Sequence, residues 1–196
     1  MFNVMTKVFA LAALMMLPLN SYAAAVEITG DSQPTYTNNG TLTGTLTIIT
    51  DPFFGIIDPI VGIYNIGSSN IITNATSGTI NSSASNNERS FGIFSGDPYN
   101  FILSNNNTLT NSGTINVTGD YALVVGIESI GDGNIITNTG NITAIEGESG
   151  SGSAFGIYSF GTTTGDKIAN SGTITAIVGD NGGLLMASCP ITIALS

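Results

Sequence analysis

The stretch IANSGTITAI, residues 168–177, decides the fold because near copies of it recur along a chain of 196 residues. Four copies share one order: an apolar residue, any residue, Asn, any residue, Gly, then Thr or Asn and a second apolar residue; a fifth carries two extra residues. They are YTNNGTL at 36–42, LTNSGTI at 109–115, ITNTGNI at 136–142, IANSGTI at 168–174 and a longer version, ITNATSGTI, at 72–80. Self-similarity of this kind indicates a repeat architecture.

A second motif, Val/Phe-Gly-Ile, alternates with the first. It occurs at 61–63, 91–93, 125–127 and 155–157, with a looser copy, FGI, at 54–56. The Asn positions of the first motif, residues 38, 74, 111, 138 and 170, lie 36, 37, 27 and 32 residues apart. The spacing predicts a unit of about 30 residues whose loops vary in length.

Each unit is predicted to form strand, turn and strand, with one apolar and one polar face. Residues two apart in an extended strand point the same way, so Ile174 and Ala176 share one face while Thr173 and Thr175 share the other. One such unit cannot bury its apolar face, but a stack of units can. We therefore predict an all-β fold, a right-handed parallel β-helix, across residues 24–183.

Within the stack, the repeated Asn is expected to point inward and to form a ladder in which each amide donates to the next. The ladder matters because an unsatisfied buried polar group costs roughly 1–3 kcal/mol. The Gly that follows each Asn is expected to provide a positive φ for a sharp corner. The ladder residues are Asn38, Asn74, Asn111, Asn138 and Asn170, and the corner glycines are Gly40, Gly78, Gly113, Gly140 and Gly172. The alternative, hairpin turns in a β-sandwich, requires two-residue Asn-Gly loops, and only Asn39-Gly40 fits.

Residues 1–23 have the features of a secretory signal peptide. Lys7 precedes the apolar run 8–17, and Pro18 and a small-residue stretch at 21–25 follow it. The run is about half of the roughly 20 residues that span a bilayer, so we expect cleavage after Ala23, or alternatively Ala25, and no membrane span in the mature chain. An uncleaved N-terminal anchor is the other possibility.

The mature chain is acidic and almost free of basic residues. Only Arg89 and Lys167 oppose thirteen acids, which gives 2 − 13 = −11. This balance argues against nucleic acid, whose phosphates require clustered Lys and Arg, and against an anionic membrane surface. The single cysteine, Cys189, cannot form an internal disulfide.

Gly-Ile-Tyr segments that alternate with Asn-Ser-Gly-Thr-Ile turns, behind a signal peptide in an acidic, cysteine-poor chain, resemble the passenger region of bacterial autotransporters (type V secretion). The resemblance covers residues from about 36 to 183. It implies export across the inner membrane and passage through an outer-membrane β-barrel of the same polypeptide, to the cell surface or the medium. The chain departs from the family after Gly183. The tail 184–196 lacks Asn and Gly and no barrel follows, so it is either a coil cap or the scar of a truncation or frame shift, which would leave the product periplasmic.

Catalytic residue sets are scarce. The absence of histidine excludes Ser-His-Asp and Cys-His arrangements and the usual zinc ligands, so we expect no catalytic residues, no metal, no cofactor and no enzyme activity. A polysaccharide lyase or glycosidase that uses clustered carboxylates is the alternative. The acids that adjoin Gly, namely Asp97, Asp120, Asp132, Asp166 and Asp180, are explained by turn propensity. The GDGN and GDNGG segments, at 131–134 and 179–183, are likewise assigned to loops rather than to calcium.

The run TLTGTLTIIT, residues 41–50, places four threonines on one face, a pattern that occurs on ice-binding solenoids. Later units do not keep Thr-x-Thr, so threonine is interpreted as an ordinary solvent-facing strand residue. We expect an adhesin-like or stalk function, with variable loops at 82–89, 96–107 and 147–153 that contact a host-cell surface, matrix protein or glycan. A remnant without independent function is the remaining alternative, and the oligomeric state is left open.

Overall fold

The computed structural model describes residues 23–29, 35–44, 60–84, 89–96, 103–120, 123–147, 152–161, 165–179 and 185–192. These residues form β-strands and no helix. The strands are β1 (Ala23–Thr29), β2 (Thr35–Asn38), β3 (Thr41–Gly44), β4 (Ile60–Ile66), β5 (Ile71–Asn74), β6 (Thr79–Ser83), β7 (Ser90–Ser95), β8 (Thr108–Asn111), β9 (Thr114–Gly119), β10 (Leu123–Ile130), β11 (Ile135–Asn138), β12 (Asn141–Glu146), β13 (Ser153–Gly161), β14 (Lys167–Asn170), β15 (Thr173–Ile177) and β16 (Leu185–Thr192).

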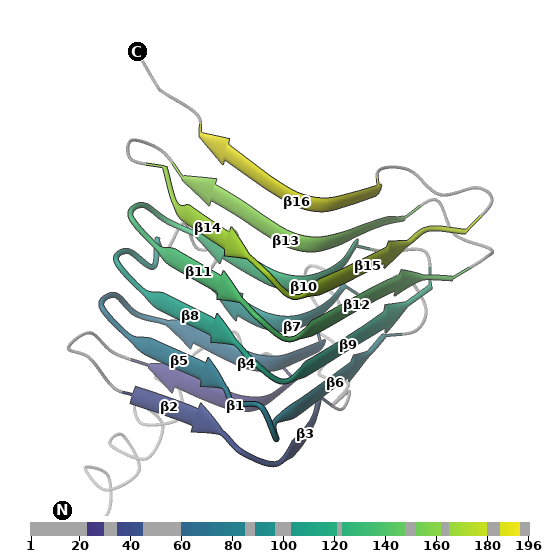
Figure 1. The fold of residues 1–196 in the computed structure, drawn as a ribbon, viewed down its shortest axis with the longest axis horizontal. Coiled ribbons are helices and arrows are strands. Elements are labelled where there is room, and N and C mark those ends of the chain that lie inside the picture. The colour runs from purple at the N-terminus through teal and green to yellow at the C-terminus, as the bar shows by residue number, and fades with distance from the viewer. Residues whose placement is uncertain are drawn as a thin grey trace, which may run out of the picture.

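Every third strand is paired in parallel, so the chain winds as a parallel β-helix with three strands per turn (Figure 1). Sheet A runs in the order β1-β4-β7-β10-β13-β16, sheet B in the order β2-β5-β8-β11-β14, and sheet C in the order β3-β6-β9-β12-β15. Sheet A forms the long rear wall, and sheets B and C form the two shorter walls in front. The predicted fold class is confirmed.

One sequence repeat corresponds to one coil. The Asn-x-Gly motif joins the last two strands of each coil, as between β8 and β9, while Val/Phe-Gly-Ile lies in the long strand of sheet A. The prediction of strand, turn and strand therefore described sheets B and C and missed the third wall. Register is kept from coil to coil: Val61 faces Phe91, and Ile63 faces Ile93.

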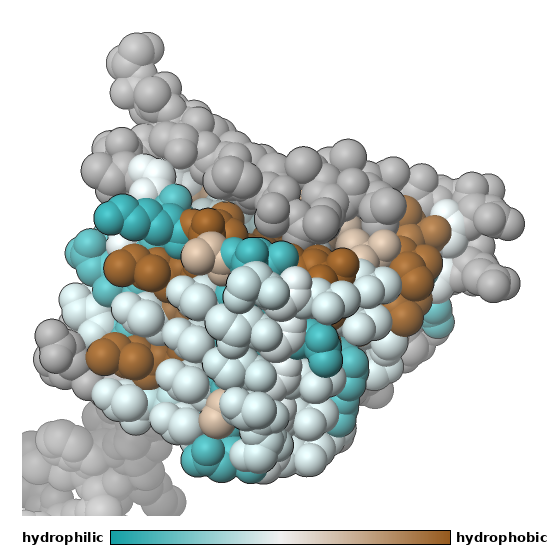
Figure 2. Space-filling model, in the orientation of Figure 1, coloured by the Kyte–Doolittle hydropathy of each residue, from teal (hydrophilic) through white to brown (hydrophobic). Residues whose placement is uncertain are grey.

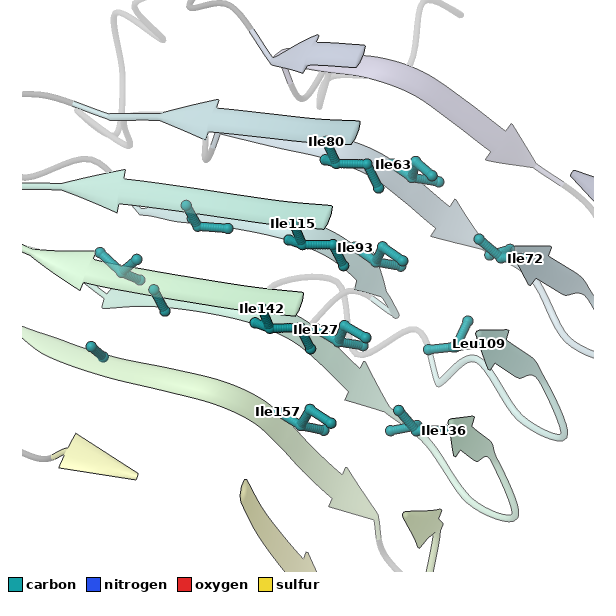
Figure 3. Close-up of a cluster of buried hydrophobic side chains, with 14 of the residues drawn as sticks. Ile63, Ile72, Ile80, Ile93, Leu109, Ile115, Ile127, Ile136, Ile142 and Ile157 are labelled. Atoms are coloured by element: carbon teal, nitrogen blue, oxygen red, sulfur yellow. The ribbon is translucent and has the colours of Figure 1, made fainter. Parts of the chain in front are cut away.

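The interior is filled by apolar columns that run along the helix axis. Each wall supplies one, and Figure 3 shows the equivalent side chains stacked in successive coils. The columns are Ile63, Ile93, Ile127 and Ile157 from sheet A, Ile72, Leu109 and Ile136 from sheet B, and Ile80, Ile115 and Ile142 from sheet C. All ten are at most 1% exposed, so the coils together bury what one coil alone would leave in water.

Sheet A is buried on both faces. Ile63 lies in the interior, while its neighbour Tyr64 belongs to a second apolar cluster with Phe91 and Phe94. Adjacent residues of a strand point to opposite faces, so Tyr64 and Phe94, which follow the interior Ile63 and Ile93, lie on the outward side of the sheet. The Phe91 and Phe94 rings are stacked with centroids 4.6 Å apart. The long strands are consequently apolar on both sides, unlike the alternating strands of sheets B and C.

Several predicted segments fall partly outside the described residues. Residues 1–22 of the predicted signal peptide lie outside them, and Ala23, the expected cleavage site, is the first residue of β1, where it pairs with Ile60. The predicted tail contributes β16, which pairs in parallel with β13 and extends sheet A beyond Gly183. No helix among the described residues is long and apolar enough to cross a bilayer.

Candidate functional site

The five asparagines singled out from the sequence lie in one continuous ladder. In each of the first four, the side-chain Nδ2 donates to the Oδ1 of the equivalent asparagine in the next coil. The donor–acceptor distances are 2.8 Å for Asn38 to Asn74 and Asn74 to Asn111, and 2.7 Å for Asn111 to Asn138 and Asn138 to Asn170. The first four side chains are at most 4% exposed, whereas Asn170 is exposed in the last coil. The ladder has a direction, because every amide donates toward the C-terminal end.

The reason proposed for the corner glycines was wrong. Among the described glycines, a positive φ occurs at Gly96, Gly131 and Gly133, and at none of the five corner glycines. The corner glycines are instead pressed against the coil before them. A Cβ at Gly140 would overlap the carbonyl oxygen of Gly113. Glycine is therefore required at these corners because a side chain would collide with the preceding coil, and not because the backbone has a positive φ.

Gly40 marks the limit of that rule. It lies in the first coil, and a Cβ placed there meets no atom within 4 Å. The glycines of Val/Phe-Gly-Ile serve close packing too, because a Cβ at Gly92 would overlap the Ile115 side chain and one at Gly126 the Ile142 side chain. Both motifs repeat glycine where neighbouring chain segments touch.

A second ladder, which sequence reasoning missed, lies at the corner between sheets A and B. The Asn107 Oδ1 accepts from the Asn70 backbone N–H at 2.8 Å, and the Asn134 Oδ1 accepts from that of Asn107 at 2.7 Å. In the last coil Asp166 replaces Asn and accepts from the Asn134 N–H at 2.8 Å. These residues stand four positions before Asn74, Asn111, Asn138 and Asn170, so an Asn/Asp-x-x-x-Asn pattern in the sequence was the available signal.

This second ladder changes the interpretation of one predicted binding loop. Ser104 and Asn107 belong to the expected loop 96–107, yet both are fully buried. The Ser104 hydroxyl accepts from the Gly67 N–H at 3.2 Å. The C-terminal end of that segment is thus a structural corner, while residues 97–102, 85–88 and 148–151 of the predicted loops lie outside the described part of the chain.

The outward face of sheet C bears hydroxyl and amide side chains in columns. On sheet C two columns run across all five strands. The first column is Thr41, Thr79, Thr114, Asn141 and Thr173, and the second is Thr43, Asn81, Asn116, Thr143 and Thr175. Figure 2 shows this front side covered largely by residues of near-neutral hydropathy. Thr45 and Thr47 of the predicted threonine run lie outside the described residues.

One acid lies within the outward aromatic cluster of sheet A. Glu128 sits in register between Phe94 and Tyr158 and is 5% exposed. Burial raises the pKa of its carboxyl to about 8, and the nearby Arg89 guanidinium opposes that rise. The Oε2 atom has no hydrogen-bond partner. Burial thus favours the neutral form of Glu128, and the sequence pattern did not indicate this buried acid.

The remaining acids have separate structural surroundings. Glu146 is 1% exposed and accepts from the backbone N–H groups of Gly152 and Gly179, at 3.4 and 3.2 Å. Asp166 belongs to the second ladder, while Asp97 and Asp180 lie outside the described residues. Within the described part of the chain no three His, Cys, Asp or Glu side chains are grouped as metal ligands would be.

Cys189 is placed in β16, opposite Tyr158 of β13.

No family model matches the sequence, and neither the curated proteins nor the solved structures contain a significant match.

Proposed function

We propose that the chain is an exported, non-enzymatic β-helical scaffold of the autotransporter-passenger type, which acts as an adhesin or as a structural stalk. The observation that supports this proposal best is that the inward positions of the repeat are kept while the length of the repeat varies. Inward positions recur from coil to coil, as Asn in the ladder and as large apolar residues, mostly Ile, in the columns, whereas the ladder asparagines are separated by 36, 37, 27 and 32 residues. The variation in coil length lies between the strands, and binding residues commonly lie in the segments that connect the strands of a rigid scaffold.

The structure also supports a rod that holds its shape without disulfides. The Asn ladder and the apolar columns run through successive coils, so each coil is tied to the next by hydrogen bonds and packing. A stalk or adhesin needs this kind of persistence, because its ligand contacts must be presented away from the attachment point. The family resemblance in the repeats adds the expectation of export.

The test is a binding screen with the purified mature chain, residues 24–196. The chain is applied to host cells, to immobilised matrix proteins and to a glycan array. Two loop variants replace residues 85–88 or 148–151 with Gly and Ser, and Thr37→Ala on the outer face of sheet B serves as the matched control. Loss of binding in a loop variant but not in the control supports the proposal. Turnover of a polysaccharide by the chain contradicts the proposal, and no binding to any of these surfaces contradicts its adhesin part.

A further inference from the structure

The outward face of sheet C is a regular two-column array. Five strands, β3, β6, β9, β12 and β15, each contribute one side chain to each column, and all ten are exposed or half-buried. Seven are threonine and three are asparagine: Asn81, Asn116 and Asn141. Three of the four later coils lose Thr-x-Thr, as the sequence indicated, but asparagine takes the place of threonine without breaking either column.

The array has a fixed spacing in two directions. Strands of a sheet are about 4.8 Å apart and alternate residues of a strand about 6.6 Å apart, so the array repeats by about these lengths along and across the stack. Within the second column the Asn116 Nδ2 donates to the Asn81 Oδ1 at 3.0 Å. Just beyond the array, the Thr118 hydroxyl donates to that of Ser83 at 2.9 Å. The backbone ladders beneath hold these positions, so little freedom is lost on binding.

Charge and chemistry restrict the ligand that this face can take. The chain has a formal net charge of −10, yet none of the ten residues is charged. None is aromatic either, so the face offers no ring on which a sugar could stack. Sheet B does not share these properties, because its first outward column contains Ile71, Ile135 and Lys167. A neutral, extended partner with its own lattice of hydroxyl-like groups fits the sheet C face.

We propose that the outward face of sheet C binds ice. The faces of hexagonal ice present rows of water oxygens at repeats close to the two spacings of the array, and each threonine offers a hydroxyl for a lattice position and a methyl group that rests between rows. Single contacts of this kind are weak. Ten contacts on one rigid surface engage together, and their combined effect greatly exceeds that of any one of them. This activity goes beyond the proposed scaffold role and does not depend on the loops.

The test uses the mature chain and follows single ice crystals by microscopy in supercooled solution, together with the rate of ice recrystallisation. The wild-type chain is expected to shape the crystals and to slow recrystallisation. Thr143→Arg places a long cationic side chain in the array and is expected to abolish both effects. The matched control is Thr110→Arg on the outer face of sheet B, which is expected to keep them. Circular dichroism and melting temperature show that both variants are folded.

Thr143→Val provides a second measurement, since it keeps the branched shape and loses only the hydroxyl. A partial loss is expected for this variant. The proposal is overturned if the wild-type chain leaves ice growth unchanged, or if Thr110→Arg loses activity as completely as Thr143→Arg. Binding to crystalline cellulose or chitin without an effect on ice also overturns it, and assigns the face to a polysaccharide.

Discussion

Replacement of Asn111 by aspartate tests the direction of the Asn ladder. Asn111 accepts a hydrogen bond from the Asn74 amide at 2.8 Å and donates one to the Asn138 Oδ1 at 2.7 Å, and its side chain is fully buried. An ionised carboxylate only accepts hydrogen bonds. The carboxylate introduced by Asn111→Asp would therefore keep the bond from Asn74. It would also leave the Asn138 Oδ1 without its donor and would face that oxygen with a negative charge.

The expected loss follows from these contacts. An orphaned buried acceptor costs roughly 1–3 kcal/mol and a lost hydrogen bond about 0.5–1.5 kcal/mol. Asn111→Leu, which removes both bonds of the ladder, should thus lower the free energy of unfolding by about 2–4 kcal/mol. Asn111→Asp should cost at least as much at neutral pH, because it adds an unpaired buried charge. At acid pH the protonated carboxyl can donate to Asn138, so the loss relative to wild type should shrink for the aspartate variant and persist for the leucine variant.

The assay is urea denaturation followed by far-ultraviolet circular dichroism at neutral and acid pH, with wild type measured under the same conditions. Asn170→Asp is the control variant, because Asn170 is exposed and accepts its hydrogen bond from Asn138. It should lose little stability. A direction of donation toward the C-terminal end is contradicted if Asn111→Asp is as stable as wild type at neutral pH, or if Asn170→Asp loses as much stability as Asn111→Asp.

Three further predictions concern the glycines, the core and the buried acid. Gly113→Ala forces a Cβ against the Gly78 carbonyl and should cost about 1–3 kcal/mol in urea denaturation, whereas Gly40→Ala should stay within about 0.5 kcal/mol of wild type. Ile115→Ala should cost about 2–5 kcal/mol by the same assay, and a loss as small as that of the exposed Ile135→Ala would contradict the column assignment. The pKa of Glu128 is about 8 in the folded chain against 4.5 in the unfolded chain, so the folded chain holds this proton more tightly. The free energy of unfolding should therefore fall as pH rises between these values, by up to about 5 kcal/mol. A pH series of melting curves in which Glu128→Gln falls as steeply as wild type would refute that assignment.

The Asn ladder was predictable because its signal is local and repeated. Asn and the apolar residue two before it must share a face in any extended strand, and the recurrence required stacking. The reason for the corner glycines was not predictable in the same way. Single-chain geometry suggests a positive φ, while the actual constraint at Gly140 comes from the Gly113 carbonyl, an atom of another coil.

Other features escaped prediction because they depend on contacts between coils. The second ladder uses Asn107 and Asn134, whose side chains accept from backbone groups one coil earlier. Glu128 became buried through the cluster that covers the outer side of sheet A, and its alternation with Ile127 gave no sign of that. The threonine array was missed because identity was required at each position, whereas the register accepts Asn116 in the place of threonine.

Distances between spin labels along one column test the stacked architecture most directly. The second outward column of sheet B consists of Ala169, Thr137, Thr110, Thr73 and Thr37. With one label fixed at position 169, we predict separations that grow by about 4.8 Å per coil, to about 19 Å at position 37. Distances that follow the unequal sequence separations, or that fail to increase steadily with coil number, would contradict the stacked architecture.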